Sequence, residues 1–166
     1  MLFNSLNFAI FLPIVFFIYW FATKENLKLQ NILLLVSSYF FYSSWDWRFL
    51  FLLVFSTLLD YYTGIKIHEA TNKRKKLFWL WLSIGINLSF LGVFKYYNFF
   101  AESFADGLSL LGFNANLGSL QVILPVGISF YTFHGLSYVI DLYKNRINPE
   151  RNFINYSVFV SFFPLL

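Results

Sequence analysis

The sequence of 166 residues contains little charge and no cysteine. Only 12% of its residues are charged, whereas 58% are hydrophobic and 24% aromatic. A soluble domain carries about twice this share of charge, because its surface must be solvated. The composition therefore excludes a water-soluble globule, a disordered chain and a nucleic-acid-binding protein. Without cysteine there is no disulfide, thiolate metal site or thiol nucleophile, and the two histidines are too far apart in sequence to suggest a metal site.

Long apolar stretches make up most of the chain. A membrane helix needs about 20 mostly apolar residues, and such stretches cover about 1–23, 29–45, 48–65, 77–94 and 121–142, with a sixth opening at Phe153. The first stretch has no basic residue before it and no small-residue cleavage site, so we expect it to be retained as a helix. The sequence predicts an all-α, multi-pass membrane protein with about six spans, the last one truncated at Leu166.

The basic residues test this count of spans. Ten of the twelve lie in three alternate connections, and only Arg48 and Lys95 fall on the other side. Because basic loops stay in the cytoplasm, this distribution places the N-terminus outside and the three connections inside. The ten residues are Lys24 and Lys28, then Lys66, Lys73, Arg74, Lys75 and Lys76, then Lys144, Arg146 and Arg151.

A stretch between the fourth and fifth spans has a different pattern. Over about 96–111, apolar residues recur every three or four positions and polar residues occupy the opposite stripe. This pattern predicts an amphipathic helix lying on the outer membrane surface and ending at Gly112.

Polar residues inside the spans are candidates for a cavity or a helix contact. In the third span Ser56, Asp60, Thr63 and Gly64 share one helical face. Packing or contact with water at the cytoplasmic end is favoured for Asp60, and a substrate path is the alternative. In the fifth span four further residues point in one direction at helical spacing and are candidates for lining a cavity: Tyr131, His134, Tyr138 and Asp141.

Ser137 beside His134 and Asp141 adds a third interpretation of the fifth span. These are the residue types of a nucleophilic triad, and their spacing would let them touch along one helix. No glycine-rich elbow accompanies them. A hydrogen-bonding stripe that lines a cavity is therefore favoured, with plain helix packing next and the triad last.

Three segments, 31–50, 93–99 and 123–143, resemble the membrane-bound O-acyltransferase superfamily, in particular its alginate O-acetyltransferase branch. The most specific is the run Leu124-Pro-Val-Gly-Ile-Ser-Phe-Tyr-Thr-Phe133. By this resemblance, residues 1–166 are the N-terminal part of a single membrane domain. The family's catalytic histidine is expected beyond Leu166, so no catalytic residue is assigned within the chain. His134 stands where relatives have Gln or Glu.

The resemblance implies an O-acyltransferase of the bacterial inner membrane. Acetyl-CoA or a similar cytoplasmic acyl donor would be the substrate, an exported polysaccharide such as alginate the acceptor, and a periplasmic acetyltransferase a partner. No tightly bound cofactor is expected, and the fragment alone is expected to be inactive. A non-catalytic membrane subunit or a transporter is the alternative from another class.

The predicted topology can be tested by labelling, because the chain has no cysteine of its own. A cysteine placed at Asn72 should react with a membrane-impermeant maleimide only from the cytoplasmic side, and one placed at Asn116 only from outside. Labelling of both from the same side would contradict the six-span arrangement.

Overall fold

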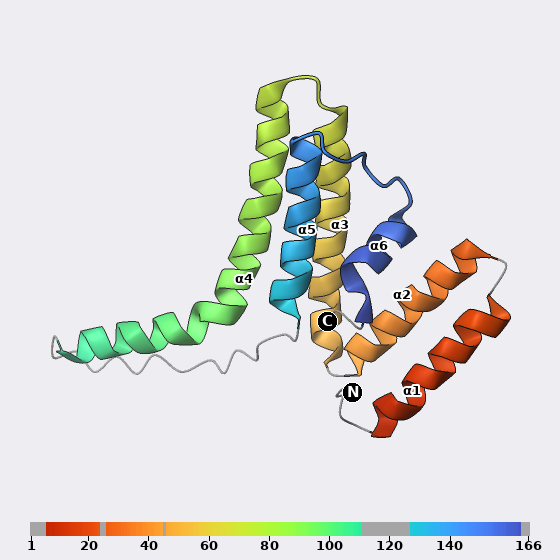
Figure 1. The fold of residues 1–166 in the computed structure, drawn as a ribbon. Coiled ribbons are helices and arrows are strands. Elements are labelled where there is room, and N and C mark those ends of the chain that lie inside the picture. The colour runs from red at the N-terminus through yellow and green to blue at the C-terminus, as the bar shows by residue number, and fades with distance from the viewer. Residues whose placement is uncertain (1–5, 24–25, 45, 111–126, 164–166) are drawn as a thin grey trace.

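The computed structural model describes residues 6–23, 26–44, 46–110 and 127–163, and within these ranges every regular element is a helix. In order they are α1 (Leu6–Phe17), the π-helical turn η1 (Ile18–Ala22), α2 (Leu27–Ser43), α3 (Trp47–Glu69), α4 (Lys73–Leu110), α5 (Ile128–Tyr143) and α6 (Phe153–Ser161). Figure 1 shows α3, α4 and α5 side by side, with α6 against α3 and α2, and α1 outermost. The all-helical prediction is confirmed for this part of the chain.

The bundle has an apolar exterior and a polar interior. The helix α3 and the first part of α4, Lys73–Tyr96, are long and apolar enough to cross a membrane, and only 22% of the most apolar stretch of α4 is buried. By contrast Ser38, Asp60 and Asn87 are almost completely buried. Lipid favours this arrangement, because polar groups are costly in hydrocarbon and face the protein interior. The chain is a membrane protein, and the count of six spans stays a prediction.

Side chains of Asn or Asp mark the beginnings of four helices. Each accepts a hydrogen bond from a backbone N–H group of the first turn, which the helix itself leaves without a partner. These residues are Asn26 before α2, Asp46 before α3, Asn72 before α4 and Asn152 before α6. The helix α5 begins instead at Gly127, whose φ of 75° lies in the left-handed region that favours glycine.

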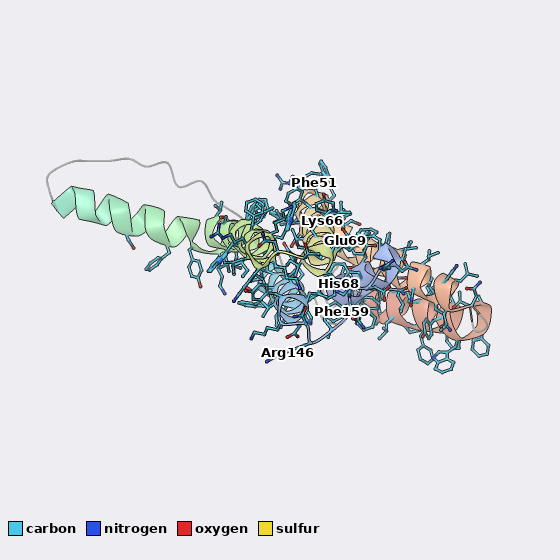
Figure 2. All side chains as sticks on the ribbon, turned by 90° about the horizontal axis from the view of Figure 1, so that it is seen from above. Phe51, Lys66, His68, Glu69, Arg146 and Phe159 are labelled. Carbon is cyan, nitrogen blue, oxygen red and sulfur yellow. The ribbon has the colours of Figure 1, made fainter. Side chains whose placement is uncertain are left out.

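Two of the basic connections meet at one end of the bundle. Lys76 Nζ at the start of α4 donates a hydrogen bond of 3.2 Å to Asn145 Oδ1 after α5. Figure 2, viewed from above, shows that same end, with Lys66, His68 and Glu69 at the end of α3 and Arg146 after α5. Lys66 pairs with Glu69 at 3.1 Å. The hydrogen bond between Lys76 and Asn145 agrees with the predicted placement of both connections on one side of the membrane.

The surface helix predicted over 96–111 is not a separate element. Helix α4 runs without interruption from Lys73 to Leu110 and includes it, and Figure 1 shows its last turns bending away from the bundle. No proline occurs in α4, and no glycine lies between Gly92 and Gly107, where the two predicted helices adjoin, so nothing there breaks the backbone ladder. Gly112, the predicted end point, lies outside the described residues.

The sixth helix is shorter than predicted. Helix α6 ends at Ser161, whereas a helix from Phe153 to Leu166 was expected. Phe163 precedes a proline, and a residue in that position avoids the α-helical region. Its N–H group donates instead to Ser38 Oγ of α2, at 3.1 Å. Nine residues of helix reach only about 14 Å, so α6 by itself does not span the hydrocarbon.

Gly64 lets α3 and α5 approach closely. A Cβ atom at this position would lie 2.8 Å from both Leu142 Cδ1 and Tyr138 Cε1 of α5. Small residues of this kind permit close helix packing in membranes.

We expect Gly64→Ala to destabilise the bundle by about 1–3 kcal/mol, because the added methyl group overpacks the α3–α5 contact. Gly85→Ala on α4 is the matched control, since a Cβ there meets nothing within 4 Å, and the change should stabilise the helix by up to about 1 kcal/mol. Thermal unfolding in detergent, followed by circular dichroism, measures both effects. Shifts of the same sign would contradict the packing explanation.

Candidate functional site

Asp60 is the centre of a buried polar cluster between α3 and α4. Its Oδ1 accepts hydrogen bonds from Ser83 Oγ at 2.6 Å and from Asn87 Nδ2 at 2.7 Å. Asn87 Oδ1 in turn accepts from Ser56 Oγ at 2.7 Å. These four residues, Ser56, Asp60, Ser83 and Asn87, are the polar seam, and none of them is exposed.

The seam forms because two helices carry the same polar spacing. Ser56 and Asp60 are four residues apart on α3, and Ser83 and Asn87 are four residues apart on α4. Residues at this separation lie on one helical face, so the two pairs meet when the faces pack. The sequence analysis identified the face of α3 but missed the partner pair on α4. The repeated four-residue spacing was the signal that could have found it.

The sequence analysis allowed Asp60 to contact water at the cytoplasmic end of the third span, and in the structure it does not. Its exposed fraction is 0%, because α4 covers one side of the carboxyl and α5 the other. A Cβ atom added at Gly135 of α5 would lie 1.9 Å from Asp60 Oδ2. The carboxyl group therefore sits against the backbone of α5, in a contact that only glycine allows.

Asp60 also differs from three acidic residues near the ends of the helices. Asp46 pairs with Arg48 at 2.8 Å, Glu69 with Lys66, and Asp141 with Arg146 at 3.4 Å. The hydrogen bond from Arg48 lowers the pKa of the exposed Asp46 carboxyl. Asp60 has no cation partner within the described ranges, and its Oδ2 has no hydrogen-bond partner there.

The candidates on α5 do not share one environment. Tyr131 is 1% exposed and packs in the core with Tyr42 of α2. His134 is half-buried, its Nδ1 lies 2.9 Å from the backbone oxygen of Phe130, and its ring meets Phe159 of α6 edge to face. Neither residue lines either of the two pockets found among the described residues.

Tyr138 and Asp141 do line a pocket, of about 430 Å³, between α5, α6 and their connection. The Tyr138 hydroxyl accepts a hydrogen bond of 3.0 Å from the Glu150 backbone N–H, and its ring centroid lies 4.6 Å from that of Tyr156. The pocket is lined by Ser137, Tyr138, Asp141, Ile147, Glu150, Asn155, Tyr156 and Phe159. Its lining is mixed, because aromatic and apolar side chains stand beside the polar groups of Ser137, Asp141, Glu150 and Asn155.

The one-helix triad is not assembled. The Ser137 hydroxyl donates to the backbone oxygen of His134 at 2.8 Å, not to its ring, and Asp141 pairs with Arg146. These contacts leave Ser137 without a base to activate it. The geometry of α5 therefore offers hydrogen bonding and packing, and a polar stripe that lines a cavity stays a prediction.

The sequence is similar along its whole length to known acetyltransferases. The probable alginate O-acetylase AlgI of Pseudomonas putida is 39% identical over 168 aligned positions, which cover the whole of this chain and 34% of that protein. The protein of the same name in Pseudomonas aeruginosa is 36% identical over the whole chain and 32% of its own length. The peptidoglycan O-acetyltransferase of Helicobacter pylori is 33% identical over 193 positions, covering the whole chain and 36% of that protein.

The chain belongs to the membrane-bound O-acyltransferase family. This family member spans about a third of the length of the curated relatives it matches. No protein-family model matches it, and no solved structure does. The resemblance drawn from the three sequence segments is confirmed. The polar seam and the pocket beside α6 are two of the places in the described residues where polar side chains gather.

Removing one member of the seam should destabilise the bundle. Asn87→Leu keeps roughly the same volume but leaves Asp60 Oδ1 with one donor fewer and Ser56 without its acceptor, so we expect a loss of about 2–4 kcal/mol. Ser89→Ala is the matched control on α4, because this exposed hydroxyl donates only to the Gly85 backbone oxygen of its own helix. Its effect should stay within about 0.5 kcal/mol.

The measurement is chemical unfolding in detergent micelles. Equal stability of the Asn87 and Ser89 variants would show that the seam contributes nothing to the fold.

Proposed function

We propose that this chain is part of an O-acyltransferase that acetylates an exported cell-envelope polysaccharide. The observation that carries the proposal is the identity of 33–39% with alginate O-acetylases and a peptidoglycan O-acetyltransferase along the whole chain. The residues of this chain would form membrane scaffold and part of the donor path. The catalytic histidine would lie in the portion of the relatives that the chain does not cover.

The acyl group would come from acetyl-CoA or a similar donor on the cytoplasmic side. Under the proposed topology, the α3–α4 turn and the α5–α6 connection face the cytoplasm, and the pocket beside Tyr138 opens there. Lys144, Arg146 and Arg151 lie in that connection and would attract an anionic donor. The N-terminus would lie outside and the protein would cross the bacterial inner membrane about six times.

The acceptor would be a polysaccharide on the outer side of the membrane. Two chemical routes lead to it: general-base activation of the acceptor hydroxyl, or passage of the acyl group to a periplasmic acetyltransferase. Alginate is the polymer in the names of the two Pseudomonas relatives described above, and peptidoglycan is the polymer in the name of the Helicobacter pylori protein. The shared chemistry is an ester on a sugar hydroxyl.

The alternative class, a transporter or a non-catalytic subunit, has less support. The relatives cited above are all named for acetyl transfer. In the structure, Asp60 and Asn87 are bonded to each other and enclosed by helices, whereas a permeation route needs polar groups exposed to water.

Deletion of the gene that encodes this chain tests the proposal. We expect O-acetyl esters to disappear from the exported polysaccharide and to return when the whole gene is restored. Inside-out membrane vesicles supplied with labelled acetyl-CoA should transfer the label to polymer, since this orientation exposes the cytoplasmic face. Unchanged ester content after deletion would contradict the proposal.

His134→Gln in the whole protein separates scaffold from catalysis. We expect the variant to retain most of the acetyl transfer, because Gln keeps hydrogen-bonding capacity and the His134 ring contacts only its own helix and Phe159. Ser137→Ala should be similarly mild. A loss of about a thousandfold in either variant, the scale seen when a nucleophile or base is removed, would place chemistry on α5.

A further inference from the structure

We propose that Asp60 is a proton-binding site: in the folded protein its carboxyl group is neutral, with the proton on Oδ2. The inference does not depend on the proposed function. The only bond formed is O–H, with solvent as the source of the proton.

The first argument is the uneven distribution of donors around the carboxyl group. Both donors, Ser83 Oγ and Asn87 Nδ2, bond to Oδ1, and Oδ2 receives none within the described residues. An ionised carboxylate carries its charge on both oxygens and accepts at both. A neutral carboxyl accepts mainly at its carbonyl oxygen, which fits two donors on Oδ1 and none on Oδ2 within the described residues.

The second argument is electrostatic. Asp60 is completely buried among helices whose outer surface faces lipid, and no cation within the described ranges pairs with it. A buried charge without a partner is so costly that the group becomes neutral instead. Two neutral donors on one oxygen do not replace the hydration that an anion would lose.

Tyr156 of α6 gives the carboxyl group no stabilising hydrogen bond. Its side chain is 1% exposed, and its hydroxyl, like Asp60 Oδ2, has no hydrogen-bond partner within the described residues. An ionised carboxylate would need a donor at Oδ2, so the lack of one in the described residues favours the neutral form.

The titratable side chains of the hydrophobic core in the described part of the chain are phenols, which are neutral at physiological pH. From α4 the seam receives Ser83 and Asn87. The phenols are Tyr39 and Tyr42 of α2, Tyr61 of α3 itself, Tyr131, Tyr138 and Tyr143 of α5, and Tyr156 of α6.

Gly135 is the positioning residue of this site. Because a side chain at 135 would occupy the place of Oδ2, the glycine allows the protonated oxygen to lie against α5, on the side of Asp60 away from α4. Any other residue there would force the carboxyl group to turn.

Infrared spectroscopy of the protein in lipid at neutral pH tests the proposal directly. We expect a C=O stretching band of a protonated carboxyl group, and we expect Asp60→Asn to abolish it. Asp141→Asn is the matched control, because Asp141 is partly exposed and paired with Arg146, and the band should survive that change. Absence of the band in the unaltered protein, or its persistence in Asp60→Asn, would overturn the proposal.

Two further measurements keep the test independent of folding of the variant. Labelling the unaltered protein with ¹³C-carboxyl aspartate should shift the band, whereas labelled glutamate should leave it in place; the opposite result would assign the proton elsewhere. Ser83→Ala should shift the band without removing it, because Oδ1 loses one of its two donors. A band that does not move would overturn the assignment of Oδ1 as the carbonyl oxygen.

Discussion

The structure depends on satisfying a carboxyl group that has no access to water. Lipid offers no hydrogen bonds, so every polar atom inside the bundle needs a partner from a neighbouring helix. Asp60 takes its partners from α4 and its space from α5, and in doing so it fixes how the three helices face one another. Rotation of any one of them by a few tens of degrees would break these contacts and turn polar atoms toward hydrocarbon.

Glycine and tyrosine complete the arrangement around this carboxyl group. Gly64 and Gly135 lie on opposite partners of the α3–α5 contact, and each receives a side chain from the other helix. The short helix α6 closes the remaining side through Tyr156, whose ring packs against Tyr138 and Tyr61. The pocket beside Tyr138 therefore has one rigid wall, built on α5, and one wall from a nine-residue helix that is anchored by Asn31 and Asn155 at 2.8 Å.

Sequence reasoning predicted the elements better than their contacts. The positions of α2, α3 and α5 followed from hydrophobic length, and the buried face of α3 followed from the spacing of Ser56 and Asp60. The partner of Asp60 was missed: the four-residue spacing of Ser83 and Asn87 marks a second polar face, but which polar faces meet is decided by helix packing. The end of α6 was misplaced because hydrophobicity continues through Phe163, whereas the following proline decides where the helix ends. The pocket residue Glu150 was missed, since it contributes through its backbone N–H group as well as its side chain.

The unbroken but bent course of α4 has a geometric consequence. Its 38 residues correspond to about 57 Å of helix measured along the axis, nearly twice the hydrocarbon thickness of about 30 Å. Ser83 and Asn87 belong to the part that is long and apolar enough to cross a membrane, Lys73–Tyr96, so the polar seam anchors that part. Beyond it the same hydrogen-bonded backbone bends and continues to Leu110, away from the bundle (Figure 1). One helix therefore joins two directions, one that crosses the bundle and one that leaves it.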